Sequence, residues 1–233
     1  MTNSFINDKN ISMPRVSRII ATDYPHHVTQ RGNYQQPVFE TEHDFSQYIS
    51  WLKEYKEKYL LDIWAYCLMF NHVHFICVPR KDDSLARTFN TLHMKYAQYL
   101  HKKKNLRGHL WQGRFYSCIL DETHLYAAVR YVENNPVRAG IVNNPEEYKW
   151  SSARGHINRG LDPLLSEDCY LFEEIKNWQA YLQEKDEKVF IENIVKSIQS
   201  GRPCGDENFV KQVEQKIGKS LNVLPKGRPR KRP

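Results

Sequence analysis

The sequence predicts an α+β fold of the ferredoxin-like type, in which a split βαβ arrangement forms one antiparallel sheet. The first observation is the order of the patterns, because strand-like and amphipathic helical runs follow one another as β-α-β-β-α-β over residues 26–120. The second is an added helical run at 122–140. Both helices of such a unit pack on one face of the sheet, so the other face can receive a ligand or the added helix.

The first two elements are indicated by turn and capping signals. Residues 26–33, HHVTQRGN, have a β-branched centre followed by a turn signal, which predicts a strand. Residues 41–60 carry apolar side chains at helical spacing, and Thr41 precedes them as the expected N-cap. The chain should therefore begin its fold as strand, then helix.

Two β-rich runs at 61–70 and 72–79 predict a hairpin. They are separated by about two residues around Phe70 and Asn71, which suits a tight turn. Asn71 lacks the Gly partner that is usual in such a turn.

The second helix and the last strand follow the hairpin. Residues 83–105 repeat apolar side chains at helical spacing, with Ser84 as the expected N-cap. Residues 108–120 return to aromatic and β-branched types, interrupted by Gly113, and predict the final strand.

The remaining segments define the expected domain organisation. Residues 1–12 are polar and aperiodic and are expected to be disordered. A main domain at 13–160 is expected, followed by a helical extension at 161–200. Residues 201–233 are expected to form a short amphipathic helix and a basic tail, and the chain contains no internal repeat.

Composition limits the class of protein. The chain has 233 residues and a formal net charge of +7, which makes nucleic acid the first partner to consider. Its five cysteines form no CxxC pair and lie mostly in apolar runs, which predicts reduced core residues in a cytoplasmic protein. With DNA as the partner, that protein is expected to be associated with the nucleoid. No apolar run reaches the roughly 18 residues that a membrane span needs.

His72 and His74 stand out inside the second strand of the hairpin. Side chains alternate along a strand, so the two imidazoles share one face, where they could bind one divalent ion together with a third ligand. The alternative is that this face is solvated and the two histidines are ordinary surface residues, with Val73 and Phe75 on the core face. The strand pattern alone leaves both interpretations open.

A second candidate group lies in the helical run at 122–140. This helix should stop by Asn135, because Pro136 disfavours helix in the residue before it. Tyr131 and Asn135 are four residues apart and are expected on one helical face. A phenol and a carboxamide there would suit a nucleophile beside a third metal ligand.

Five segments resemble those of the IS200-like tyrosine transposases and, within them, the REP-associated tyrosine transposases. They follow the family's order and spacing over about residues 13–156. The segments are HHVTQRGN, YCLMFNHVHFICVP, LWQGRFYSCIL, YVENNPVRAGIV and YKWSSARGH. A series of this kind is far more specific than the histidine pair alone.

The resemblance implies a ferredoxin-like sheet and HUH endonuclease chemistry. His72 and His74 match the histidines that hold Mg²⁺ or Mn²⁺, and Asn135 matches a position where relatives bring a polar side chain to the metal. Tyr131, rather than Tyr126, matches the nucleophile. The implied reaction cuts single-stranded DNA, leaves a 5′-phosphotyrosine and a free 3′-hydroxyl, and rejoins strands without ATP. The implied substrate is a hairpin of a REP element. The expected assembly is a monomer or a homodimer.

Several basic residues are predicted to contact DNA. Arg31 and Arg114 lie in the matching segments, and Lys102 and Lys103 belong to a cationic run. The neighbouring histidines His26 and His27, at the start of the first strand, could approach DNA or the metal, but surface or packing roles are favoured for both.

The C-terminal stretch PKGRPRKRP resembles an AT-hook. Arg228 belongs to its Gly-Arg-Pro core and Arg230 follows that core, and both would enter the narrow minor groove of A·T-rich duplex DNA. A basic tail that adds only nonspecific affinity is the alternative.

Two other functions remain open at the level of sequence. The chain could be a noncatalytic, domesticated DNA-binding protein of the same fold, although intact His72, His74 and Tyr131 argue against this. It could also be a metal-dependent phosphodiesterase that uses water and needs no tyrosine. RNA binding is less favoured because the strands lack a clear aromatic stacking motif.

Overall fold

The computed structural model describes residues 18–185 and 187–221. The expected disordered segment 1–12 and the AT-hook-like tail with Arg228 and Arg230 lie outside the described residues. The elements in chain order are β1 (His26–Arg31), η1 (Asn33–Gln35), α1 (Glu42–Lys58), β2 (Leu61–Met69), β3 (His72–Pro79), α2 (Ser84–Lys104), β4 (Tyr116–Ile119), α3 (Glu122–Glu133), α4 (Asn135–Arg138), η2 (Pro145–Glu147), α5 (Ala153–Asn158), α6 (Leu171–Glu174), α7 (Trp178–Gln183), α8 (Lys188–Ser200) and α9 (Glu207–Ile217).

The sheet has the strand order β2-β3-β1-β4, and every neighbouring pair is antiparallel. This order is that of the ferredoxin-like split βαβ unit, so the predicted fold class is confirmed. β1 and β3 occupy the centre, with Thr29 opposite His74 and Arg31 opposite His72. The turn between β2 and β3 falls at Phe70 and Asn71, as the hairpin prediction required.

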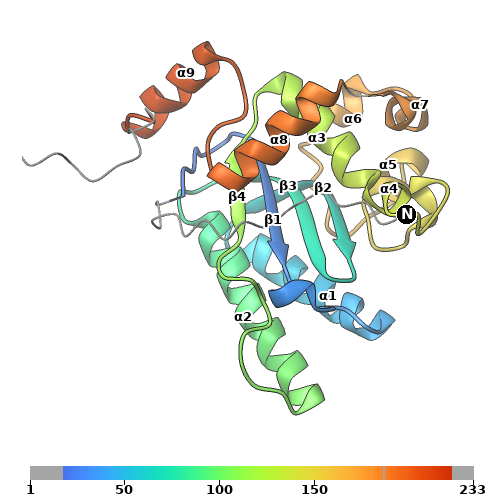
Figure 1. The fold of residues 1–233 in the computed structure, drawn as a ribbon. Coiled ribbons are helices and arrows are strands. Elements are labelled where there is room, and N and C mark those ends of the chain that lie inside the picture. The colour runs from blue at the N-terminus through green and yellow to red at the C-terminus, as the bar shows by residue number, and fades with distance from the viewer. Residues whose placement is uncertain (1–17, 186, 222–233) are drawn as a thin grey trace, which may run out of the picture.

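Helices cover both faces of the sheet. Figure 1 shows α1 and α2 on one side and α3 and α8 on the other. One core cluster joins Val28, Val73 and Phe75 to α1 and α2, whereas a second joins Ile76 and Cys118 to α3, α7 and α8. The face left open by the split βαβ unit is therefore occupied by the added helix, and the predicted extension at 161–200 packs on the same core as α3.

Two elements differ from their predicted lengths. The last strand spans only Tyr116–Ile119, because the segment before it runs as a loop that forms a β-bridge between Trp111 and Gly32. Ser84 is the first residue of α2 rather than its N-cap, which is Asp83. The Ser84 hydroxyl instead accepts a hydrogen bond from the backbone N–H of Lys81.

All five cysteines are buried and unpaired, as expected for core residues. The loops and helices of the C-terminal part bury Cys169 and Cys204 in the same way as the strands bury the others. Within the described ranges, no helix has the length and apolar character needed to cross a membrane.

Asp44 fixes the start of α1 and joins it to α2. Thr41 is the N-cap, as predicted, and forms a reciprocal capping box with Asp44. The buried Asp44 carboxylate also accepts hydrogen bonds from the Tyr99 hydroxyl at 3.0 Å and the Lys103 ammonium at 2.7 Å. Its pKa lies well below the ordinary value because the bonds from Lys103, Thr41 and Tyr99 outweigh the opposing effect of burial.

We predict that Asp44→Asn lowers the free energy of unfolding by about 2 kcal/mol at pH 7, since a charged acceptor of several bonds is lost. A depressed carboxyl pKa contributes stability above the unfolded pKa of about 3.9, and that contribution is lost as the pH falls further. The difference between the two proteins should therefore shrink below about pH 4. Urea unfolding at pH 7 and pH 3 measures it, with the exposed Glu57→Gln as control. If the difference in free energy of unfolding between Asp44→Asn and the parent protein increased on acidification, this account would be contradicted.

Candidate active site

His72 and His74 lie on the face of the sheet that α3 covers. Their ring centroids are 5.0 Å apart, and Val73 and Phe75 point into the opposite core, as alternation requires. His74 is only 8% exposed. The interpretation of the two histidines as ordinary solvated surface residues is therefore wrong, because α3 closes over their face.

Burial keeps both imidazoles neutral. Desolvation, followed by the charges of Arg31 and Arg138, lowers the pKa of His72 to about 3. Desolvation also lowers the pKa of His74 well below its ordinary value, and the neighbouring His72 and His27 add to this effect. A neutral imidazole retains a nitrogen lone pair, which is the form that binds a metal ion.

The turn beside β3 sets the tautomer of His72. Asn71 donates through Nδ2 to the Gln35 carbonyl, so its Oδ1 accepts the hydrogen bond from His72 Nδ1 at 2.6 Å. The second nitrogen of His72, Nε2, then carries the lone pair. Gly32, directly after β1, allows the neighbouring loop to fold closely, because a Cβ at that position would lie 2.3 Å from the Gln36 carbonyl oxygen.

His27 lies against the histidine pair, which the sequence left open as the less favoured of two alternatives. Its Nε2 lies 2.9 Å from His74 Nδ1, and both rings are buried. This hydrogen bond fixes the orientation of the His74 ring and leaves His74 Nε2 as the nitrogen free of that contact. His26 behaves as predicted, because it packs inside the fold with Nδ1 against the Tyr24 carbonyl at 2.7 Å. Side chains alternate along β1, so His27 shares the face of Thr29 and His26 lies on the opposite face. This rule could have predicted different surroundings for the two histidines.

Tyr131 projects from α3 onto this histidine cluster. Its ring centroid is 5.8 Å from that of His74 and 6.1 Å from that of His27, with edge-on geometry in each case. The Arg138 guanidinium lies 4.0 Å from the Tyr131 ring centroid and donates to the Tyr131 carbonyl at 2.7 Å. The phenol of the predicted nucleophile therefore lies beside both the histidines and a cation.

The neighbouring tyrosine and arginine of α3 point elsewhere. The Tyr126 hydroxyl donates to Glu174. Arg130 forms an ion pair with Glu184 at 2.9 Å and covers the Tyr181 ring. The choice of Tyr131 over Tyr126 thus agrees with the geometry, and Arg138 rather than Arg130 is the arginine next to the phenol.

Asn135 does not share a continuous helix with Tyr131. α3 ends at Glu133, and Asn135 begins the short α4. Among the described residues, no hydrogen bond or ring contact joins Asn135 to the histidines. Its side chain is nevertheless buried, and its Nδ2 has no hydrogen-bond partner. If the side-chain amide is rotated by a half-turn, Oδ1 takes the position of Nδ2. An oxygen in that buried position requires a hydrogen-bond donor or a cation.

A buried carboxylate holds α3 in place. Glu133 is fully buried and accepts hydrogen bonds from Trp178 Nε1 at 2.8 Å, from the Ser152 hydroxyl and from His156 Nδ1. The His156 ring stacks on Trp178 with centroids 4.0 Å apart. Glu133, Ser152 and His156 lie in matching segments of the sequence, but only the fold shows that they meet. Residues from α5 and α7 therefore fix the helix that carries Tyr131.

The predicted DNA contacts are divided between several places. Arg31 is half-buried on β1 opposite His72, on the histidine face. Arg114 is exposed in the loop before β4, and Lys102 is exposed at the end of α2. Lys103 forms the ion pair with Asp44 described above, so it has a structural partner.

No cluster of three or more His, Cys, Asp and Glu side chains suited to a metal ion occurs in residues 18–185 and 187–221. Any metal at this site would have to use His72 and His74 with an amide, water or DNA oxygen to complete its ligands. The neutral imidazoles and the orphaned Asn135 amide fit that requirement.

Comparison with known proteins identifies a family and a related fold. Residues 21–135 match the family model described as transposase IS200 like. A solved structure of a REP-associated tyrosine transposase bound to a REP hairpin superposes with a TM-score of 0.51 and 19% sequence identity, covering 67% of this chain and 93% of that chain. A search of curated proteins gives no match.

The fold is an α+β domain whose antiparallel sheet carries a histidine cluster next to a tyrosine of α3. Through residues 21–135 the chain belongs to the IS200-like transposase family, as the sequence motifs predicted.

We predict that Glu133→Ala lowers the free energy of unfolding by about 3 kcal/mol, because it leaves three buried donors without an acceptor. In a chain of this size the melting temperature should fall by roughly 6–12 °C. Thermal unfolding measures the change, and the exposed Glu173→Ala should stay within about 0.5 kcal/mol of the parent protein. Equal melting temperatures for Glu133→Ala and the parent would show that the network does not hold α3.

Proposed function

We propose that this protein is a metal-dependent endonuclease and strand transferase for single-stranded DNA, and that Tyr131 is its nucleophile. The proposal is carried by one observation: Tyr131 lies in ring contact with His74 and His27 within a single chain. A phenol beside a pair of neutral, oriented imidazoles suits phosphoryl transfer better than it suits passive binding.

His72 and His74 would hold a divalent cation through their Nε2 atoms, and Asn135 would supply an amide oxygen. When bound, the cation would act as a Lewis acid on a nonbridging oxygen of the scissile phosphate and neutralise charge in the transition state. Two imidazole donors favour Mn²⁺ over Mg²⁺, because Mg²⁺ prefers oxygen ligands alone. For His74 to present Nε2, its Nδ1 must donate to His27, so His27 acts as a positioning residue.

The chain supplies the nucleophile and its activation. A free phenol has a pKa of about 10 and reacts poorly at neutral pH. Arg138, over the Tyr131 ring, stabilises the negative charge that spreads into the ring as the phenolate forms. The tyrosine-phosphorus bond then forms as the bond from phosphorus to the 3′-oxygen breaks. A 3′-hydroxyl can later reverse this step and rejoin a strand.

The proposed substrate is a hairpin of repetitive palindromic DNA with a single-stranded flank. The REP-associated branch of the family is supported by the similarity to a relative solved with a REP hairpin. Arg31, on the histidine face, would meet the scissile strand, and Lys102 would meet a more distant phosphate. Arg228 and Arg230 would bind A·T-rich duplex next to the hairpin.

One protomer should be sufficient for the reaction. Tyr131 and the histidines come from the same chain, and Glu133 fixes α3 through residues of that chain as well. Exchange of the catalytic helix between two copies would require those buried bonds to break.

We predict that the protein forms a covalent adduct with single-stranded oligonucleotides copied from such hairpins, and that the adduct requires Mn²⁺ or Mg²⁺. Tyr131→Phe should abolish the adduct because the attacking oxygen is absent, whereas the matched Tyr126→Phe should retain it. Denaturing electrophoresis detects the product. Strand cleavage that survives Tyr131→Phe would favour a water-using phosphodiesterase, and binding without adduct or cleavage would favour a noncatalytic protein.

A mixture of variants serves as the control for assembly. His74→Ala and Tyr131→Phe should each be inactive, and mixing them should restore no adduct if one protomer holds the whole site. Restored activity would show that the nucleophile acts on a partner copy.

A further inference from the structure

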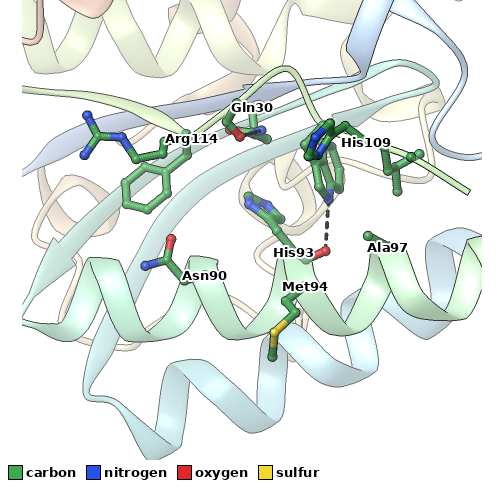
Figure 2. A pocket seen from close by; sticks show the side chains of 12 residues that line it. Gln30, Asn90, His93, Met94, Ala97, His109 and Arg114 are labelled. Atoms are coloured by element: carbon green, nitrogen blue, oxygen red, sulfur yellow. Dashed lines mark hydrogen bonds between the residues drawn. The ribbon is translucent and has the colours of Figure 1, made fainter. Parts of the chain in front are cut away.

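A pocket of about 270 Å³ lies between α2 and the loop before β4. Figure 2 shows Asn90, His93 and Ala97 on the helix and Gln30, His109 and Arg114 across from them. Gln30 belongs to β1 but points away from the histidine face, because its neighbours Thr29 and Arg31 occupy that face. The pocket is therefore separate from the cluster around Tyr131.

The pocket walls are suited to a flat ring. The buried Trp111 and Phe115 side chains line it together with the imidazoles of His93 and His109. Trp111 Nε1 donates to the His93 carbonyl at 3.0 Å, and His93 Nε2 lies 2.9 Å from the Tyr48 hydroxyl, so these rings are held in place. Rigid aromatic and imidazole surfaces of this kind stack with nucleobases.

A buried carboxamide at the pocket has unused hydrogen-bonding capacity. Gln30 is 2% exposed, and its Nε2 donates to the Gly113 carbonyl at 3.2 Å. Its Oε1 is buried and has no partner. Asn90 provides a second, exposed amide on the opposite wall. Carboxamides recognise the edges of bases because they present a donor and an acceptor together.

Two arginines make this region cationic. Arg18 lies over the Phe115 ring, 3.6 Å from its centroid, and its Nη2 is buried without a partner. Burial and the nearby charge of Arg114 lower the pKa of Arg18 to about 10. The residues that line the pocket include no Asp or Glu. An anion between the two guanidinium groups would relieve their repulsion.

We propose that this pocket binds one unpaired nucleotide of the DNA strand, with the base against Trp111 and His109 and the phosphate near Arg114 and Arg18. This inference rests on the proposed function and adds a recognition site to it. The base edge would be read by Gln30, on the face of the sheet opposite Tyr131. A DNA strand could reach both places by passing the end of β1 at Arg31, where the backbone N–H of Gln112 donates to the Arg31 carbonyl.

Photocrosslinking of the full chain tests the proposal. The probes are hairpin oligonucleotides with 5-iododeoxyuridine at successive unpaired positions, and the crosslinked peptide is then mapped. One position should crosslink within residues 109–115. Ala97→Phe, which fills the pocket from α2, should abolish that crosslink and weaken binding by about 5- to 150-fold. Arg114→Gln should reduce the slope of log affinity against log salt by about 1.

The controls separate this site from folding effects and from catalysis. Ala180→Phe and Lys53→Gln are exposed matched substitutions that should change neither the crosslink nor the affinity. A crosslink that persists in Ala97→Phe, or none within residues 109–115, would overturn the pocket even if the Tyr131 adduct forms. Crosslinking without any adduct would support the pocket while refuting the proposed reaction. If free dTMP occupied the pocket and the oligonucleotide did not, the assignment of the pocket to a DNA strand would be overturned.

Discussion

The antiparallel pairing of β1 with β3 is the constraint on which the candidate site depends. It places Thr29 opposite His74 and Arg31 opposite His72, so their side chains share one face with His27. A shift of one residue would turn His72 and His74 into the apolar core beneath the sheet. The strong burial of Val73 and Phe75 against α1 and α2 opposes that shift. The hydrophobic core thus sets the register of the polar cluster.

The second requirement is that α3 lies correctly on the histidine face. Its apolar side chains pack on β2 and β3, but the orientation is fixed by polar contacts from later parts of the chain. Glu133 binds Trp178 and His156, and Arg138 binds the Tyr131 carbonyl. The C-terminal helices therefore contribute to the site by holding the tyrosine helix, in addition to any contact that they make with DNA.

Local patterns predicted much of this arrangement. Alternation placed His72 and His74 on one face, the Thr41 capping signal located α1, and the motif order singled out Tyr131, whose ring lies next to His74. The contact of His27 with His74 was only the less favoured alternative, because the two residues are 47 positions apart along the chain. The Glu133 network and the pocket beside Gln30 were missed for the same reason, since their members come from distant segments. The predicted strand at 108–120 was too long because aromatic residues such as Trp111 pack on α2 from a loop and not from a strand.

Manganese binding tests the central claim most directly, since it depends on the histidine arrangement and not on turnover. Electron paramagnetic resonance of free Mn²⁺ during titration would measure the affinity of the full chain and its variants. The account predicts that His72→Ala and His74→Ala lose the site, that His27→Ala weakens it by about 10- to 100-fold, and that the exposed His43→Ala binds normally. Unchanged Mn²⁺ affinity in His74→Ala would contradict the assignment of this cluster as a metal site.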